Sequence, residues 1–198
     1  RPAWNCERDL WFQDLSDRLP GNFEILNIPQ QVLKLLSFDN VLEKIYIWLE
    51  SVEGENEGYL VFTSPATVRA LGMYLNVFEC QQARGQVKFK NQPSDISNVL
   101  AIKLLKQTIR LACIGSGTKL ILKDLLKAFI ADSMQIENLI EKTLSIDINA
   151  DSYSFVSKFE KNFENKSILL FQGLQNKPFL STKLQESAKK VEVVPLYI

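Results

Sequence analysis

Tyr59-Leu60-Val61-Phe62-Thr63-Ser64-Pro65 is the stretch that decides the predicted fold. Its run of apolar residues is typical of a strand buried on both faces, and we expect a strand over residues 59–63. Ser64 followed by Pro65 is typical of a helix start, because a hydroxyl caps the first turn and proline has no N–H to lose there. The stretch therefore predicts a strand, a short turn and a helix.

The same unit recurs twice, and a further strand follows. Each unit has an apolar, β-branched run, a loop of small or hydroxyl residues, and apolar residues at helical spacing. The expected strands are residues 109–114, 167–171 and 191–197. One expected helix begins at Thr118, and another passes through Leu180, Leu184 and Ala188. Such alternation predicts an α/β fold, with a parallel sheet flanked by helices and right-handed crossovers.

Three loops are expected at one edge of this sheet, because the carboxyl ends of parallel strands meet there. They are residues 63–65, 115–118 and 172–178. Each precedes a helix, whose free N–H groups and dipole favour carboxylates or phosphates. Ordinary caps and turns would give the same pattern. The three loops together, beside a basic segment, favour an anion site.

Charge is distributed unevenly, although 23 basic and 23 acidic residues cancel overall. Residues 84–127 hold nine basic and two acidic residues, a net charge of +7, whereas residues 1–83 hold six and twelve. Lys119, Lys123 and Lys127 recur every four residues, so a helix would place them on one stripe. The stripe is either a solvated helix face or a surface that attracts an anion. Nucleic acid is disfavoured as that anion, because Phe89 is the only aromatic residue of the segment.

The sequence has no histidine, which excludes Ser-His-Asp and Cys-His catalysis and imidazole metal ligands. Three cysteines, Cys6, Cys80 and Cys113, are widely spaced and disfavour both a disulfide framework and a zinc site. We therefore expect no metal, and a reducing cytoplasmic location. No stretch is apolar enough to span a membrane. Asp147, Asn149 and Asp151 imitate a calcium loop, but Ser152 replaces its turn glycine, and we interpret this segment as a capped turn.

Six landmarks, taken in order, resemble the uroporphyrinogen-III synthase family. Phe62-Thr63-Ser64-Pro65 resembles its strand-to-helix turn, and Cys113-Ile114-Gly115-Ser116-Gly117-Thr118 resembles its Gly-x-x-Thr turn. Leu169 to Gly173 resembles its strand ending in glycine, and Val191 to Tyr197 resembles its Val-x-x-Tyr strand. Near the start, Arg1-Pro2 resembles the Arg-Pro that follows the family's first strand, and Phe23 to Pro29 resembles the segment that leads to the next lobe. No single landmark is specific to this family, but the order of the landmarks along the whole chain is specific to it.

The resemblance implies two α/β lobes with the substrate between them. It implies that hydroxymethylbilane, a linear tetrapyrrole with many carboxylates, is closed to uroporphyrinogen III with inversion of the last ring and loss of water. No cofactor, nucleic acid, membrane or partner subunit is implied, and the protein would act as a monomer. The implied site comprises Tyr197 as the donor to the departing hydroxyl, and the substrate-binding residues Thr63, Ser64, Ser116, Thr118 and Gln172.

The resemblance implies that this chain contains unequal parts of the two lobes. Residues 1–29 would be a piece of the first lobe, 30–190 a complete lobe, and 191–198 a linker strand returning toward the first lobe, whose remainder is largely missing from this chain. The alternative function is a non-catalytic single lobe that binds an anionic ligand or a protein. For Tyr197 the alternative is a linker tyrosine buried for packing, and for the serine and threonine hydroxyls it is helix capping.

Overall fold

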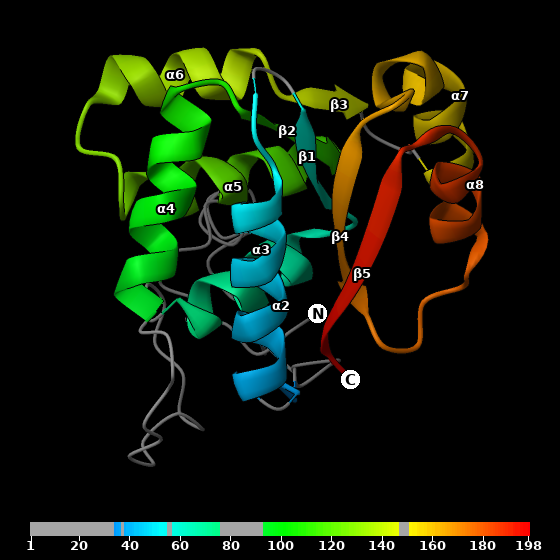
Figure 1. Ribbon diagram of the computed structural model, residues 1–198, viewed down its shortest axis with the longest axis horizontal. Helices are drawn as coiled ribbons and strands as arrows, with labels where there is room; N and C mark the ends of the chain where they lie inside the picture. Colours follow the sequence, from blue (N-terminus) through cyan, green and yellow to red (C-terminus); the bar gives the residue numbers. More distant parts are fainter. Residues whose placement is uncertain (1–33, 37, 55–56, 76–92, 147–150) are drawn as a thin grey trace, which may run out of the picture. The chain divides into compact units, whose positions relative to one another are not determined.

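A computed structural model describes residues 34–36, 38–54, 57–75, 93–146 and 151–198 (Figure 1). The chain divides into two units, Arg1–Lys34 and Leu35–Ile198, and the fold described below is that of the second. Its strands are β1 (Gly58–Phe62), β2 (Ile109–Ile114), β3 (Leu144–Ile146), β4 (Ser167–Gly173) and β5 (Lys190–Tyr197). The helices in the described residues are α2 (Phe38–Ser51), α3 (Pro65–Tyr74), α4 (Pro93–Leu105), α5 (Ser116–Lys127), α6 (Ser133–Glu141), α7 (Ser152–Phe163) and α8 (Phe179–Ser187).

The five strands form one parallel sheet in the order β3-β2-β1-β4-β5. The chain builds outward from β1 through β2 to β3, and then crosses to the other side of β1 to add β4 and β5. The direction of winding therefore reverses between β1 and β4. In open α/β sheets such a reversal leaves a crevice beyond the carboxyl ends of the two strands, where ligands commonly bind.

The predicted α/β fold, with a parallel sheet flanked by helices, is confirmed. The strand expected at 109–114 is observed with those bounds, and the other three differ from the observed strands by one or two residues at their ends. The helix expected from Thr118 begins at Ser116 instead. Residues 191–197, expected as a linker strand, form most of the edge strand β5. Residues 1–29, expected as a piece of the first lobe, lie outside the described residues, as does Phe78 of the helix expected after Pro65.

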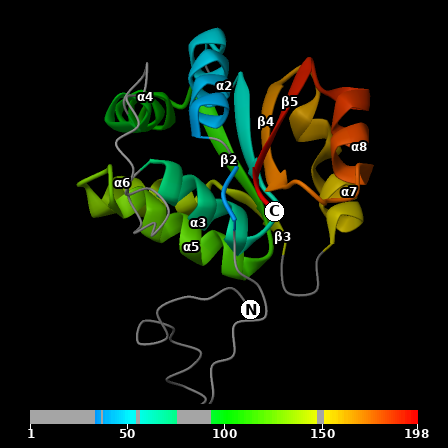
Figure 2. The ribbon, with the colours of Figure 1, turned by 90° about the horizontal axis from the view of Figure 1, so that it is seen from below.

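Two apolar cores lie on the two faces of the sheet. On one face, residues of β1, β2 and β4 such as Phe62, Cys113 and Phe171 pack with α2 to α6. On the other face, the alternate residues, such as Val61 and Leu170, pack with α7 and α8. Figure 2 shows α7 and α8 on one side of the strands and α3 to α6 on the other. The reversal of winding explains this division, because right-handed crossovers in opposite directions place their helices on opposite faces.

Tyr74, the last residue of α3, anchors the carboxyl end of β5. Its buried hydroxyl lies 3.1 Å from the carbonyl oxygen of Leu36 and 2.9 Å from that of Leu196. The N–H of Leu36 also donates to Leu196 (3.2 Å), and Leu35 pairs with Tyr197 in an antiparallel bridge. The segment before α2 is thereby fastened beside the last strand.

We expect Gly58→Ala to destabilise the protein by about 1–3 kcal/mol, because overpacking a filled core carries such a cost. A Cβ at Gly58 would lie 2.9 Å from Cη2 of Trp48 and 3.0 Å from methyl groups of Ile109 and Val52. Gly117→Ala is the matched control: its Cβ meets only Pro65 Cγ, at 3.8 Å, and should leave stability unchanged or raise it by about 0.4–1 kcal/mol. Urea unfolding measures both variants, and equal stabilities would contradict the expectation.

Candidate functional site at the carboxyl edge of the sheet

The three predicted loops do lie at one edge of the sheet, at the carboxyl ends of its strands. Phe62, the last residue of β1, is paired with Cys113 in β2 and with Phe171 in β4. Gly173, at the end of β4, is paired with Tyr197. The loops that follow β1, β2 and β4, together with the end of β5, therefore lie along a single edge.

Ser64 begins helix α3, as the sequence predicts. Its hydroxyl accepts from the N–H of Thr67 (3.3 Å), while the Thr67 hydroxyl accepts from the N–H of Ser64 (3.2 Å), which is a reciprocal capping box. The same Ser64 oxygen lies 3.4 Å from the hydroxyl oxygen of Tyr197. Ser64 thus caps the helix and also contacts the tyrosine expected to act in catalysis.

Tyr197 reaches Ser64 because β5 is irregular at its end. The pairing passes from Gln172↔Pro195 to Gly173↔Tyr197, so β5 contains one extra residue there. Such a bulge redirects the side chain that follows it. Leu196 and Tyr197 both pack against the core on the α2–α6 face, which consecutive residues of a regular strand could not do. The half-buried ring of Tyr197 then lies over Gly173, where a Cβ would be 3.1 Å from ring atom Cε2.

The hydroxyls of Thr118 and Thr63 donate hydrogen bonds to backbone carbonyl oxygens of the fold. Thr118 is buried and donates to the carbonyl oxygen of Ile114 (2.6 Å), and Thr63 donates to that of Phe171 (3.2 Å). Ser116, by contrast, is exposed. It opens helix α5 after Gly115, which has a φ of +87° and provides no side-chain cap. The first turn of α5 therefore presents at this edge its backbone N–H groups and a hydroxyl that has no hydrogen-bond partner among the described residues.

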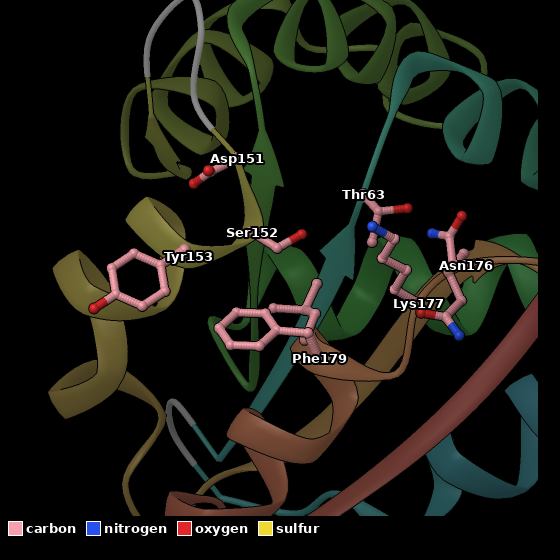
Figure 3. Close-up of a pocket in the computed structure, with 9 residues that line it drawn as sticks. Thr63, Asp151, Ser152, Tyr153, Asn176, Lys177 and Phe179 are labelled. Atoms are coloured by element: carbon pink, nitrogen blue, oxygen red, sulfur yellow. The ribbon is translucent and has the colours of Figure 1, made fainter.

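A cavity of about 540 Å³ opens at the reversal point between β1 and β4. Figure 3 shows its lining: Thr63 at the end of β1, the start of α7, and the loop from β4 into α8. Two expected site residues, Thr63 and Gln172, line it, whereas Ser64, Ser116, Thr118 and Tyr197 do not. The lining comprises Thr63, Asp151, Ser152, Tyr153, Gln172, Asn176, Lys177, Phe179 and Leu180.

The α7 side of the cavity was missed by the sequence analysis, although a signal was present. Phe155, Phe159 and Phe163 recur every four residues and are buried under the sheet, as expected of an amphipathic helix. Asp151 does cap a turn, as predicted: its carboxylate accepts from the N–H of Ser154 (2.8 Å) at the start of α7. That backbone hydrogen bond is the main reason that the pKa of Asp151 is below its ordinary value.

The basic segment does not supply the lysine of the cavity, which is Lys177. The stripe Lys119, Lys123 and Lys127 does lie on one helix, α5. Lys123 forms an ion pair with Glu137, and Lys127 with Asp124 (3.0 Å), so two of the three charges have acidic neighbours. Lys119 lies in the first turn of α5, beside the exposed Ser116. Arg84, Lys88 and Lys90 lie outside the described residues.

No protein-family model matches the chain, and no curated protein matches it. Among the described residues, no group of three or more Cys, Asp or Glu side chains is placed to hold a metal ion. None of the helices in the described segments is both long and apolar enough to cross a membrane.

Cys113 is the one cysteine among the described residues, and its environment makes it inert. Burial raises the pKa of its thiol to about 12, and the charge of Lys119 offsets this only in part. In the unfolded chain the thiol titrates near 9.0. Between pH 9 and 12 the unfolded state therefore loses a proton that the folded state keeps, and stability falls as pH rises.

We expect the free energy of unfolding of the wild type to fall between pH 8 and 10 by about 1 kcal/mol more than that of Cys113→Ala. All other titrating groups are common to the two proteins, so the difference isolates this thiol. Urea unfolding at both pH values measures it. Parallel pH profiles would show that Cys113 ionises as freely in the folded protein as in the unfolded chain.

Proposed function

We propose that this protein is a uroporphyrinogen-III synthase, which closes hydroxymethylbilane with inversion of its last pyrrole ring. In that reaction the bond between the terminal hydroxymethyl carbon and its oxygen breaks, and this carbon bonds to the substituted α-carbon of the last ring. The bond from that α-carbon to its methylene bridge then breaks, the bridge carbon bonds to the free α-carbon of the same ring, and the ring proton displaced there leaves with the hydroxyl as water. The chemistry needs a hydrogen-bond donor for the departing hydroxyl and groups that hold the carboxylates of the substrate. It needs no histidine, in keeping with a sequence that has none.

The observation that carries the proposal is the convergence of four landmarks that are far apart in the sequence. The Tyr197 hydroxyl lies 3.4 Å from Ser64 Oγ, and its ring lies over Gly173. Gly117 lies beside Pro65, with its Cβ position 3.8 Å from Pro65 Cγ. The turns after β1 and β2, the glycine that ends β4 and the tyrosine that ends β5 thus lie in one row along the carboxyl edge.

Tyr197 is well placed to donate to a leaving hydroxyl. Ser64 Oγ can donate to the phenol oxygen or accept from it. The N-terminus of α3 begins at the same residue, and its dipole stabilises negative charge that develops on the phenol oxygen as its hydrogen is given up. We assign Tyr197 as the donor and Ser64 as the residue that positions it.

The first turn of α5 is the part of this edge best suited to hold a substrate carboxylate. It combines the exposed Ser116 hydroxyl, backbone N–H groups without a side-chain cap, and Lys119. Thr118 supports the turn from inside, because its hydroxyl hydrogen is already donated to Ile114. Binding here should weaken with added salt, because the attraction is between charges near the surface.

A second candidate function is the non-catalytic binding of an anionic ligand. The cavity between α7 and α8 favours it, because Tyr197 does not line that cavity. The two functions differ in their product: a binding protein would leave hydroxymethylbilane to close without inversion.

We expect the purified full-length protein to convert hydroxymethylbilane to the type III isomer without added metal. Separation of the oxidised products by chromatography distinguishes type III from the uninverted type I isomer. A product mixture identical to that formed without protein would contradict the proposal. Activity that a chelator abolishes and zinc restores would contradict the cofactor-free mechanism.

Tyr197→Phe should lower kcat roughly ten- to a hundred-fold, because a hydrogen bond to a charged group is worth about 1.5–3 kcal/mol. Its KM and thermal stability should stay close to those of the wild type, since the ring that packs over Gly173 is retained. Tyr59→Phe is the matched control, because it also removes a phenol hydroxyl but lies near the start of β1, at the edge of the sheet opposite the row of landmarks. It should leave kcat close to that of the wild type, and full activity in Tyr197→Phe would remove Tyr197 from the mechanism.

A further inference from the structure

The cavity between α7 and α8 is a second site, on the opposite face of the sheet from the pair Ser64–Tyr197. Residues alternate between the faces along each strand, so Gln172 follows Leu170 onto the α7–α8 face, and Thr63 follows Val61. Tyr197, in contrast, packs against the α2–α6 core. We propose that this cavity binds a phosphate ester attached to a planar ring, of which a nucleoside monophosphate is the simplest example.

The start of α8 provides the site for the phosphate. Its N-cap is Pro178, which has no side-chain oxygen and makes no capping hydrogen bond. The helices α3, α6 and α7 are capped by Ser64, Asp132 and Asp151 instead. The backbone N–H groups of the first turn of α8 therefore have no side-chain acceptor, and the helix dipole adds partial positive charge. Lys177 precedes the cap, lines the cavity, and forms no ion pair within the described part of the chain.

Gln172 is an independent indication that the cavity is built for a polar ligand. Its side chain is 9% exposed and lines the cavity, yet it makes no hydrogen bond to any residue of the described segments. Its amide atoms are not among the polar atoms shut off from solvent, so they stay open to the cavity, where a ligand or water can pair with them. An amide both donates and accepts, so it can pair with the polar edge of a heterocyclic ring.

Two exposed aromatic rings provide the surface for that ring. Tyr153 of α7 and Phe179 of α8 stack with centroids 5.9 Å apart and an interplanar angle of 27°. Tyr153 is 67% exposed and Phe179 is 37% exposed, although large aromatic side chains are usually buried. Both line the cavity, and a planar ring that stacks on them would cover apolar surface that is open to water.

Opposite charges on the two sides of the cavity would orient the ligand. In Figure 3, Lys177 and Asp151 lie on opposite sides of Phe179. The phosphate would therefore bind at the Lys177 side, away from the carboxylate. Asp151 and Ser152 are then left to bind hydroxyl groups on the uncharged part of the ligand, such as a sugar. A cavity of about 540 Å³ is within the usual range for small-molecule sites.

Titration calorimetry of the full-length protein with AMP, adenosine and inorganic phosphate tests the proposal. We expect AMP to bind at least roughly ten-fold more tightly than either of its parts. Lys177→Gln should weaken AMP roughly ten-fold and leave adenosine unchanged, because only the phosphate contact is lost. Gln172→Glu, which is nearly isosteric, should also weaken AMP by adding a negative charge to the cavity. Lys106→Gln, at an exposed lysine that does not line the cavity, is the control and should change nothing.

Several outcomes would overturn this assignment. They are the absence of saturable AMP binding to the folded wild type, equal affinities for AMP and adenosine, and AMP binding that neither Lys177→Gln nor Gln172→Glu weakens. The proposal does not depend on the synthase reaction, and the two can fail separately. Tyr197→Phe should bind AMP like the wild type even where it loses synthase activity, and failure of AMP binding would leave the isomer assay unaffected.

Discussion

Strand β1 is hydrogen-bonded to β2 along one edge and to β4 along the other, and each of its residues from Gly58 to Phe62 is buried. A strand in that position must be apolar on both faces, because neither face meets water. The register with its neighbours also fixes where the following turn lies. Since Phe62 is level with Cys113 and Phe171, the turn after β1 lies between the turns after β2 and β4. The arrangement of the whole carboxyl edge follows from this central pairing.

The two faces of β1 are the reason that the same edge carries two distinct sites. Phe62 and Thr63 are adjacent in the sequence but point to opposite faces. The turn after Phe62 leads into α3 and places Ser64 against Tyr197 on one face. Thr63 lines the cavity under α7 and α8 on the other. A substitution at Ser64 would therefore affect both the capping of α3 and the contact with Tyr197. The lining of the cavity, in contrast, comes mostly from other elements.

The sequence predicts the parts of this edge that depend on local chemistry. A buried strand, a serine cap and a proline at the first helical position each leave a local pattern, and the structure confirms them around Ser64. The cavity depends instead on α7 and α8, consecutive helices on either side of β4, which meet Thr63 from a distant part of the chain. The stacking of Tyr153 on Phe179 joins residues from two helices, and no local sequence pattern predicts it. The Gln172 side chain, which lines the cavity without a hydrogen-bond partner among the described residues, can likewise be recognised only when its surroundings are known.

Tyr197 shows why a matching residue does not by itself make a site. In a regular strand, Tyr197 and Leu196 would point to opposite faces, and the phenol could not reach Ser64 from the face to which alternation assigns it. The extra residue in β5 turns the ring toward the α2–α6 face, and Gly173 leaves the space that the ring occupies. Any larger residue at position 173 would place a Cβ 3.1 Å from the ring. The glycine, which in the sequence only marks the end of a strand, therefore helps to fix the position of the tyrosine ring, because a larger residue there would require the ring to shift.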